Sequence, residues 1–365
     1  MSRRLGAGRV GVLLVVVGVF GFGIETPIYA EEFRPLYRGA RAQAMGNAFT
    51  AVADDEQAIF YNPAGLAGIT NFSWNIAAIN GDFSNDILSS NATLQAALAN
   101  PSPSAINSLI GKNYSLRAQG LASLIGPGFG FAGLYDYQGA IRIKNSALPQ
   151  GIAGAQNTYG GQVALGFRLI RFKRRKAELR MGFAGKLLYR SGGYFSPTLT
   201  EIMTLNSSLL TSRLGNPGVG FGLDTGLQLV YPVRKNFQLQ AGLAMRDIGD
   251  TTFNNGSGEV QKSNLAAGLA GIYSSNDVRL IVAFDMDRIV DYIDWRRKVH
   301  LGTELKFPLL SFSAGLSEFQ VTYGASINLG LFRVSYVSYA QEQGTVVGED
   351  PERRHLLHVA FKFEI

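Results

Sequence analysis

Hydrophobic and polar residues alternate along most of the chain between positions 72 and 365. In residues 177–190 every charged side chain falls on one face of an extended strand, since successive side chains of a strand point to opposite sides. The other face is apolar and contains Leu179, Met181, Phe183, Leu187 and Tyr189. The same division recurs in residues 219–231, 237–246 and 277–287. This pattern predicts long strands with one apolar face and one polar or glycine-rich face.

About fourteen such strands are expected, which is an even count, as in bacterial single-chain barrels. They cover residues 72–81, 115–126, 128–138, 157–170, 177–191, 216–231, 236–247, 260–273, 277–288, 295–307, 311–317, 320–329, 331–341 and 353–365. Short turns alternate with mostly longer connections, as periplasmic turns alternate with extracellular loops. The exception is Glu318-Phe319, a tight turn at a place where a long loop is due.

The predicted fold is therefore all-β: a transmembrane antiparallel β-barrel over residues 72–365, with lipid outside and a polar lumen inside. A soluble β-sandwich also alternates, but it does not require strands of ten residues or more with unbroken apolar faces. Export supports the barrel. Arg3, Arg4 and Arg9 accompany an apolar run at 10–22, and Ala30 ends the segment. Residues 1–30 are thus expected to be a secretory signal peptide, because this run is shorter than the ~20 residues that span a bilayer. The alternative is an uncleaved anchor helix.

The stretch at 37–69 is different, because it does not alternate. Its first half is rich in Ala and Gly, three acids follow at 54–56, and Asn62-Pro63-Ala64-Gly65 is a turn signal. Small side chains allow close packing against surrounding backbone, so residues 31–71 are expected to form a plug, or hatch, inside the barrel. A surface helix and loop is the alternative. The plug residues singled out are Gly39, Ala40, Arg41, Gly46, Asp54, Asp55, Asn62, Pro63, Ala64 and Gly65.

Charged residues on the polar strand faces are expected to form a network in the lumen. The residues assigned to it are Glu178, Arg180, Lys186, Arg190, Asp224, Arg246, Asp285, Asp287 and Arg296. Asp285 and Asp287 share a face and could form an acid pair or a cation site. Pairing with the arginines is the preferred interpretation, because unpaired charges in a narrow, packed lumen are costly.

Composition removes several classes of chemistry. There are 44 Gly, 23 Phe, 15 Tyr and no Cys, and the formal net charge is +7. The absence of Cys excludes disulfides, thiol catalysis and Cys metal sites. No basic run is interleaved with aromatics, so no nucleic-acid partner is expected. His355 and His358 would lie on opposite faces of a strand and cannot chelate one metal. With no HExxH, GxSxG or Walker motif, we expect neither an enzyme nor a cofactor.

The plug stretch also resembles a known family. Gly39-Ala40-Arg41, Ala53-Asp54-Asp55 and then the run at 61–66, Tyr-Asn-Pro-Ala-Gly-Leu, are similar to the N-terminal hatch of FadL-type outer-membrane transport proteins, including the related PorV-like barrels. The motif covers about thirty residues. It implies a monomeric 14-stranded barrel in the bacterial outer membrane, plugged by its hatch, and several members move long-chain fatty acids or aromatic hydrocarbons. The chain departs from the family in being shorter and in ending at Ile365 rather than an aromatic residue.

Two functions follow as hypotheses. One is a passive channel for a hydrophobic small-molecule ligand, and the other is a PorV-like interaction barrel with a secretion-system or surface-attachment partner. Short helices expected at 91–99, 105–110 and 199–210 would offer an apolar docking surface or pack on themselves over the mouth. An apolar lumen cavity beneath these loops would favour the channel. A filled lumen under a flat apolar loop surface would favour the interaction barrel.

Overall fold

The computed structural model describes residues 35–100, 102–144, 150–172, 176–198, 200, 201, 208, 212, 215–254 and 258–364. The expected signal peptide lies outside these residues. Most of the helix expected at 199–210 also lies outside them.

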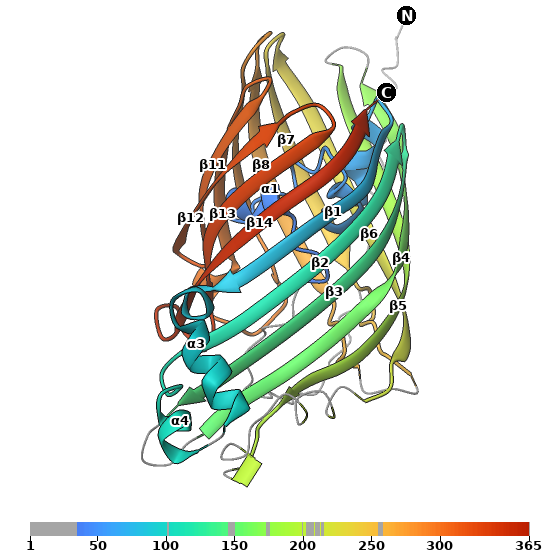
Figure 1. Cartoon of the computed structure of the whole chain (residues 1–365). Helices are drawn as coiled ribbons and strands as arrows, with labels where there is room; N and C mark the ends of the chain where they lie inside the picture. Colours follow the sequence, from blue (N-terminus) through green and yellow to red (C-terminus); the bar gives the residue numbers. More distant parts are fainter. Residues whose placement is uncertain are drawn as a thin grey trace, which may run out of the picture.

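In the described part of the chain, fourteen antiparallel strands form one closed barrel (Figure 1). They are β1 (Ser73–Ser84), β2 (Asn113–Gly126), β3 (Phe129–Lys144), β4 (Gln150–Phe172), β5 (Ala177–Phe195), β6 (Gly218–Arg234), β7 (Phe237–Arg246), β8 (Asn264–Ser274), β9 (Arg279–Met286), β10 (Val299–Lys306), β11 (Leu310–Ser317), β12 (Gln320–Asn328), β13 (Phe332–Glu342) and β14 (Pro351–Glu364). Each strand pairs with its sequence neighbours, and the first strand closes the ring by pairing Ser73 with Glu364 of the last. The predicted barrel and strand count are confirmed.

The two faces of each strand meet different surroundings. In β5, Phe183 and Leu187 are 46% and 47% exposed, whereas Ala184 and Leu188 are 3% and 1% exposed. Large apolar side chains are exposed in this way on every strand of the ring. A closed ring satisfies all of its backbone hydrogen bonds internally, and its apolar outer surface suits hydrocarbon rather than water. The barrel therefore spans a lipid bilayer. No helix among the described residues is long and apolar enough to cross a membrane.

The barrel wall is uneven in height. β4 and β5 have 23 and 19 residues, whereas β9, β10 and β11 have 8 each. At the end of the barrel opposite the C-terminus, the tall wall stands beside α3 (Asn85–Ala99) and α4 (Pro103–Asn107) (Figure 1). Long connections gather at this end, which is the pattern of the extracellular side of bacterial barrels.

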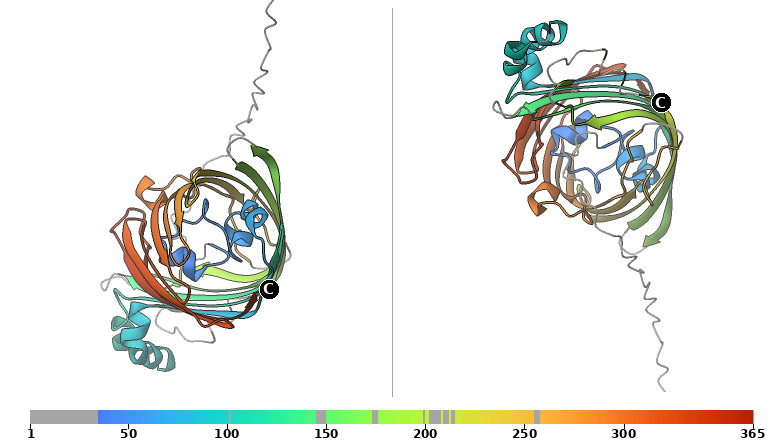
Figure 2. Two further views of the ribbon diagram at one scale, coloured as in Figure 1. Left: turned by 90° about the horizontal axis from the view of Figure 1, so that it is seen from above. Right: turned by 90° about the horizontal axis from the view of Figure 1, so that it is seen from below.

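α3 and α4 pack on each other and on the barrel wall. Ser84 caps α3 by accepting the N–H of Ile87, and Ser102 caps α4 in the same way, as expected for helix N-caps. Apolar residues of the two helices and the following loop form one buried cluster with the ends of β2 and β3: Ala97, Ile106, Leu109, Tyr114, Ile141 and Ile143. Figure 2 shows the helices beside the barrel rather than over its opening. Self-packing is therefore observed, but at the side of the barrel and not across the mouth.

Residues 35–71, here called the inner segment, lie inside the ring (Figure 2). They contain α1 (Ala40–Ala44), α2 (Ala58–Tyr61) and the 3₁₀ helix η1 (Pro63–Gly68). Four large apolar side chains of this segment, Met45, Phe49, Ile59 and Leu66, are fully buried. The segment therefore forms the core of the molecule.

Candidate functional site

Asn62 fixes the turn that leads from α2 into η1. Its side-chain Oδ1 accepts the N–H of Ala64 at 3.1 Å, and Pro63 occupies the first turn of η1, where no amide hydrogen is required. The Asn62 Nδ2 donates to the carbonyl of Thr50 at 2.9 Å and to that of Leu227 in β6 at 3.1 Å. One side chain thus closes the turn, joins two parts of the inner segment and bonds to the wall.

Wall glycines make room for this turn. A Cβ on Gly182 would collide with the backbone of Pro63 and Ala64, and one on Gly226 would collide with the side chain of Asn62. A Cβ on Gly166 would lie 2.8 Å from the carbonyl oxygen of Pro63. Three neighbouring strands, β4, β5 and β6, therefore carry glycine where the turn touches them.

The opposite wall receives residues 45–50. Gly46 has a φ of +61°, a conformation that glycine adopts without strain, and a Cβ there would collide with backbone of β10 and β11. Asp285 of β9 accepts the N–H groups of Phe49 and Thr50 at 2.8 and 2.6 Å. His300, the cross-strand neighbour of Asp285, places Nδ1 2.9 Å from the Gly46 carbonyl oxygen. The wall therefore holds this part of the segment through its backbone.

The acids of the inner segment meet basic residues of the lumen. Arg41 contacts Asp54 at 2.5 Å, Asp55 at 2.9 Å and Glu304 of β10 at 2.7 Å. Asp54 also contacts Arg279 of β9 at 2.6 Å. One arginine of the segment thus links two of its own acids to the wall.

Glu56 lies on the other side of the lumen. It faces Arg333 of β13 at 3.5 Å and Lys362 of β14 at 3.4 Å. Burial alone would raise the pKa of Glu56, but Lys362 and Arg333 outweigh it and hold the pKa below its ordinary value.

The two aspartates differ in their electrostatics. Burial would raise the pKa of Asp54, but Arg41 and Arg279 hold this pKa below its ordinary value. For Asp55, burial and the neighbouring Glu56 charge together exceed the effect of Arg41, so its pKa is raised.

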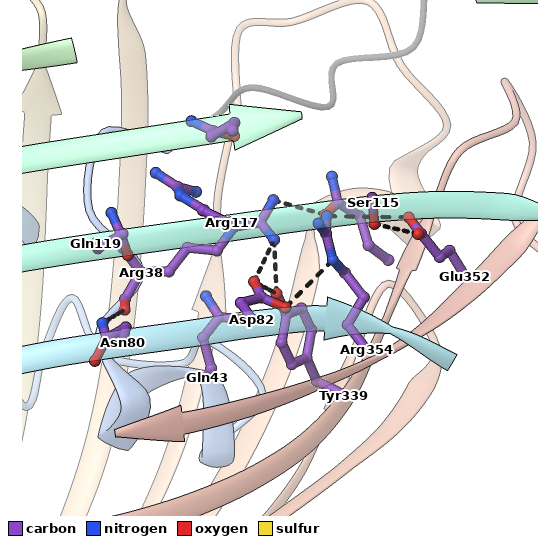
Figure 3. A network of polar contacts seen from close by, with 12 residues as sticks. Arg38, Gln43, Asn80, Asp82, Ser115, Arg117, Gln119, Tyr339, Glu352 and Arg354 are labelled. Atoms are coloured by element: carbon purple, nitrogen blue, oxygen red, sulfur yellow. Dashed lines mark hydrogen bonds and ion pairs between the residues drawn. The ribbon is translucent and has the colours of Figure 1, made fainter. Parts of the chain in front are cut away.

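A buried polar network anchors the start of the inner segment (Figure 3). Arg38 donates to the hydroxyl of Tyr339 at 2.6 Å and contacts Asp82 at 3.3 Å. Arg354 also contacts Asp82, at 3.3 Å. The backbone carbonyl of Arg38 accepts from Asn80 at 3.0 Å. This cluster was not predicted from the sequence, although strand alternation places Asp82 and Arg354 on lumen faces.

The residues predicted to form one lumen network fall into separate groups. Lys186 bridges Asp224 and Asp247, both at 2.8 Å. Arg246 pairs with Asp287 at 2.5 Å. Arg180 pairs with Glu178 at 3.0 Å on the far side of the lumen. Asp285 belongs to none of these groups and binds backbone N–H groups instead of an arginine, which corrects its predicted role.

Two predicted network arginines have other partners. Arg190 donates to Thr158, Gln261 and the Glu259 carbonyl at 2.9–3.0 Å, and stands over the Phe253 ring. The prediction for Arg296 is wrong. The strand expected at 295–307 begins at Val299, and Arg296 lies in the 3₁₀ helix η2 (Trp295–Lys298) outside the wall. There it pairs with Asp294, whose side chain caps this helix.

One cavity lies on each side of the inner segment. One, of about 100 Å³, lies towards the long connections and is lined by Arg246, Asp287, Arg288, Arg297, His300 and Glu318, among others. The other, of about 500 Å³, lies towards the chain end at Glu364 and is lined by Asp54, Glu56, Arg279 and Arg333, among others. Polar and charged side chains predominate in both linings. Within the described ranges no three His, Asp or Glu side chains converge on a possible metal position.

These observations bear on the choice between a hydrophobic channel and an interaction barrel. The inner segment fills the middle of the lumen, and neither described cavity has the apolar lining expected for a hydrophobic channel. The described loop helices α3 and α4 do not present a broad apolar face either. On α3 and α4, Leu88 is the large apolar residue that is exposed.

No protein-family model and no curated protein matches the chain. Solved structures do match it. The Ralstonia pickettii toluene transporter TbuX is 10% identical with a TM-score of 0.47, and the match covers 90% of this chain and 99% of that one. The Pseudomonas putida toluene transporter TodX is 12% identical with a TM-score of 0.49, covering 93% and 99%. A Pseudomonas aeruginosa FadL homologue is 12% identical with a TM-score of 0.31, covering 92% and 99%.

Proposed function

We propose that the protein is a plugged transport barrel of the bacterial outer membrane that takes up small hydrophobic molecules. Long-chain fatty acids and hydrocarbons are the ligand classes that the hatch motif implies. The observation that carries the proposal is the attachment of the inner segment. Hydrogen bonds and ion pairs hold this segment in the lumen, and no strand of the barrel ladder includes it. It can therefore move without breaking the barrel.

The arrangement suits passive uptake. The ligand would arrive at the end with the long connections and enter the lumen. Movement of the inner segment, or sideways exit into lipid, would then complete the passage. Each polar contact of the segment is individually worth only about 0.5–3 kcal/mol, so stepwise displacement needs no external energy source.

An interaction barrel of the PorV-like kind is the second candidate. The polar linings of both cavities favour it, because an apolar ligand gains little from such surfaces. In this case the filled lumen would act as a rigid support, and an exported protein would dock at the end with the long connections.

An engineered disulfide between the inner segment and the barrel wall would distinguish the transport barrel from the interaction barrel. A Cβ on Gly324 of β12 would lie 2.8 Å from the Cβ of Ala44 in α1, so Ala44→Cys with Gly324→Cys can form a disulfide after a shift of about 1 Å. The chain has no other cysteine to interfere. Cells expressing the variant would be assayed for uptake of labelled oleate and of toluene, with Ala44→Cys alone as the matched control.

We expect oxidation to reduce uptake to the level of empty-vector cells and reduction to restore it. Equal uptake in both redox states would show that the inner segment is not the gate. If the wild-type barrel moves neither compound faster than empty-vector cells, the transport proposal fails and the interaction barrel remains.

A further inference from the structure

The outward face of β14 carries two basic side chains on an otherwise apolar wall. This face reads Arg353, His355, Leu357, Val359, Phe361 and Phe363. Leu357 and Val359 are 50% and 42% exposed, while the intervening residues point into the lumen and are buried. A cationic side chain is costly on the lipid face at mid-bilayer and cheap only near an interface. The depth of Arg353 in the membrane therefore determines whether its charge is costly or tolerated there.

The length and tilt of β14 give the depth of Arg353 in the membrane. Ten residues separate Arg353 from Phe363, a rise of about 33 Å along the strand and about 25 Å across a bilayer at a tilt of about 40°. This matches the height of the apolar band of such barrels. Phe361 and Phe363 form an aromatic cluster with Phe332 at the edge of the band nearer the C-terminus. Arg353 and His355 then lie at the opposite edge, on the side of the long connections.

Aromatic residues of the neighbouring strands complete the surface. The ring of Tyr336 in β13 stacks on His355 at 6.0 Å, and its hydroxyl lies 2.7 Å from His355 Nδ1. Tyr323 in β12 is 50% exposed beside them. One Arg353 nitrogen, Nη1, donates to the Val321 carbonyl at 2.8 Å. We call Arg353, His355, Tyr323 and Tyr336 the outer basic patch.

Among the described residues, Arg353 forms no ion pair, in contrast to the lumen arginines Arg41 and Arg246. Its Nη1 bonds to the Val321 carbonyl, and the arginine carries further guanidinium N–H donors that can reach an acceptor at the membrane interface. Phosphate groups are the anionic acceptors available at that depth, and arginine forms its strongest hydrogen bonds to such groups.

We infer that the outer basic patch binds a phosphate group of a phosphorylated glycolipid, lipid A, in the outer leaflet. The apolar residues of the same face nearer the middle of the membrane would contact the acyl chains of the same molecule. The site would therefore bind the head group and the chains together. This inference depends on the barrel's orientation in the membrane and not on what the lumen carries.

The test uses the full-length barrel in detergent micelles, titrated with diphosphoryl lipid A and followed by native mass spectrometry. We expect Arg353→Gln with His355→Gln to weaken binding about tenfold. Arg171→Gln removes an exposed charge at the opposite rim and should change affinity less than twofold. Phosphate-free lipid A should bind the wild type as weakly as diphosphoryl lipid A binds the double variant.

Heat-modifiable migration on gels checks that each variant is folded, and the two single variants replace the double one if it is not. Unchanged affinity of the folded variants, or an equal loss in Arg171→Gln, would overturn the inference. Equal binding of phosphate-free lipid A by the wild type would overturn it as well.

Discussion

Asp285 shows how one side chain can hold a segment without a charged partner. Its carboxylate accepts two consecutive backbone N–H groups, from Phe49 and Thr50, and is 1% exposed. Anchoring by backbone leaves the side chains of the inner segment free to pack against the lumen. It also makes the attachment of residues 49 and 50 to the wall depend on a single carboxylate.

We expect Asp285→Ala to loosen the inner segment and leave the barrel intact. The substitution leaves two buried N–H groups without an acceptor, and each unmet group costs about 1–3 kcal/mol. Amide exchange at residues 45–52 should accelerate by about thirtyfold or more, while the barrel strands stay protected. Asp285→Asn keeps an acceptor and should remain close to the wild type. Equal exchange in the alanine variant and the wild type would show that this contact holds nothing.

The acids of the inner segment give a pH dependence with a definite sign. The pKa values of Asp54 and Glu56 lie below their ordinary values of 3.8 and 4.5, so their stabilisation is complete above those values. It is lost only when the pH falls through the lower folded-state pKa values. The pKa of Asp55 is raised, so its charge costs stability at neutral pH and that cost disappears as the pH falls.

Mild acid should therefore not release the inner segment, because the paired acids Asp54 and Glu56 stay charged and protonation of Asp55 removes a cost. We expect single-channel conductance in planar bilayers at pH 5 to be no greater than at pH 7. Asp55→Asn should lower the frequency of openings at pH 7 and reduce the difference between the two conditions. A conductance that rises between pH 7 and pH 5 in the wild type would contradict the electrostatics described for these acids.

At the scale of elements, β5 separates lumen and lipid functions by alternation. Gly182 and Gly185 lie on the same strand and on opposite faces. A Cβ on Gly182 would collide with Pro63 and Ala64, while one on Gly185 would meet its nearest atom, in the Leu223 side chain, at 3.9 Å. The strand thus offers a matched pair of sites three residues apart.

We expect Gly182→Leu to displace the η1 turn, because the added side chain occupies the space of the inner segment's backbone. Conductance and exposure of residues 62–66 to limited proteolysis should both increase. Gly185→Leu points into lipid and should change neither. Identical behaviour of the two variants would mean that the turn does not press on this wall.

Strands of this kind are readable from sequence because lipid and lumen impose a period of two on each of them. Arg296 is a position at which the alternation predicts a strand incorrectly. The alternation after residue 294 looks continuous, but Asp294 caps a 3₁₀ turn that delays the start of β10 to Val299. A capping acid beside a tryptophan was the available signal.

Site contacts were harder to predict than elements. The partners of Arg38 come from β1 and β13, 44 and 301 residues away in sequence. Which lumen residues meet depends on strand register and on the path of the inner segment, and neither is encoded in local periodicity. The motif around Asn62 and Pro63 located the segment, whereas its anchors on Asp285 and His300 required the fold.

At the scale of the whole molecule, the barrel does not depend on the inner segment for its backbone pairing. Every strand is bonded on both sides by other strands. We expect deletion of residues 39–65 to leave a folded barrel with a larger single-channel conductance, because water would replace the segment. A deletion variant that conducts no more than the parent would show that these residues do not block the lumen.

The pairing of β1 with β14 also sets an order of events in time. The two edges of this seam stand at opposite ends of the barrel sequence, so we expect the ring to close last, because contacts between distant residues form slowly. The inner segment directly precedes β1 and is surrounded when that happens. We therefore expect the wall to close during biogenesis around a segment that already lies between its edges.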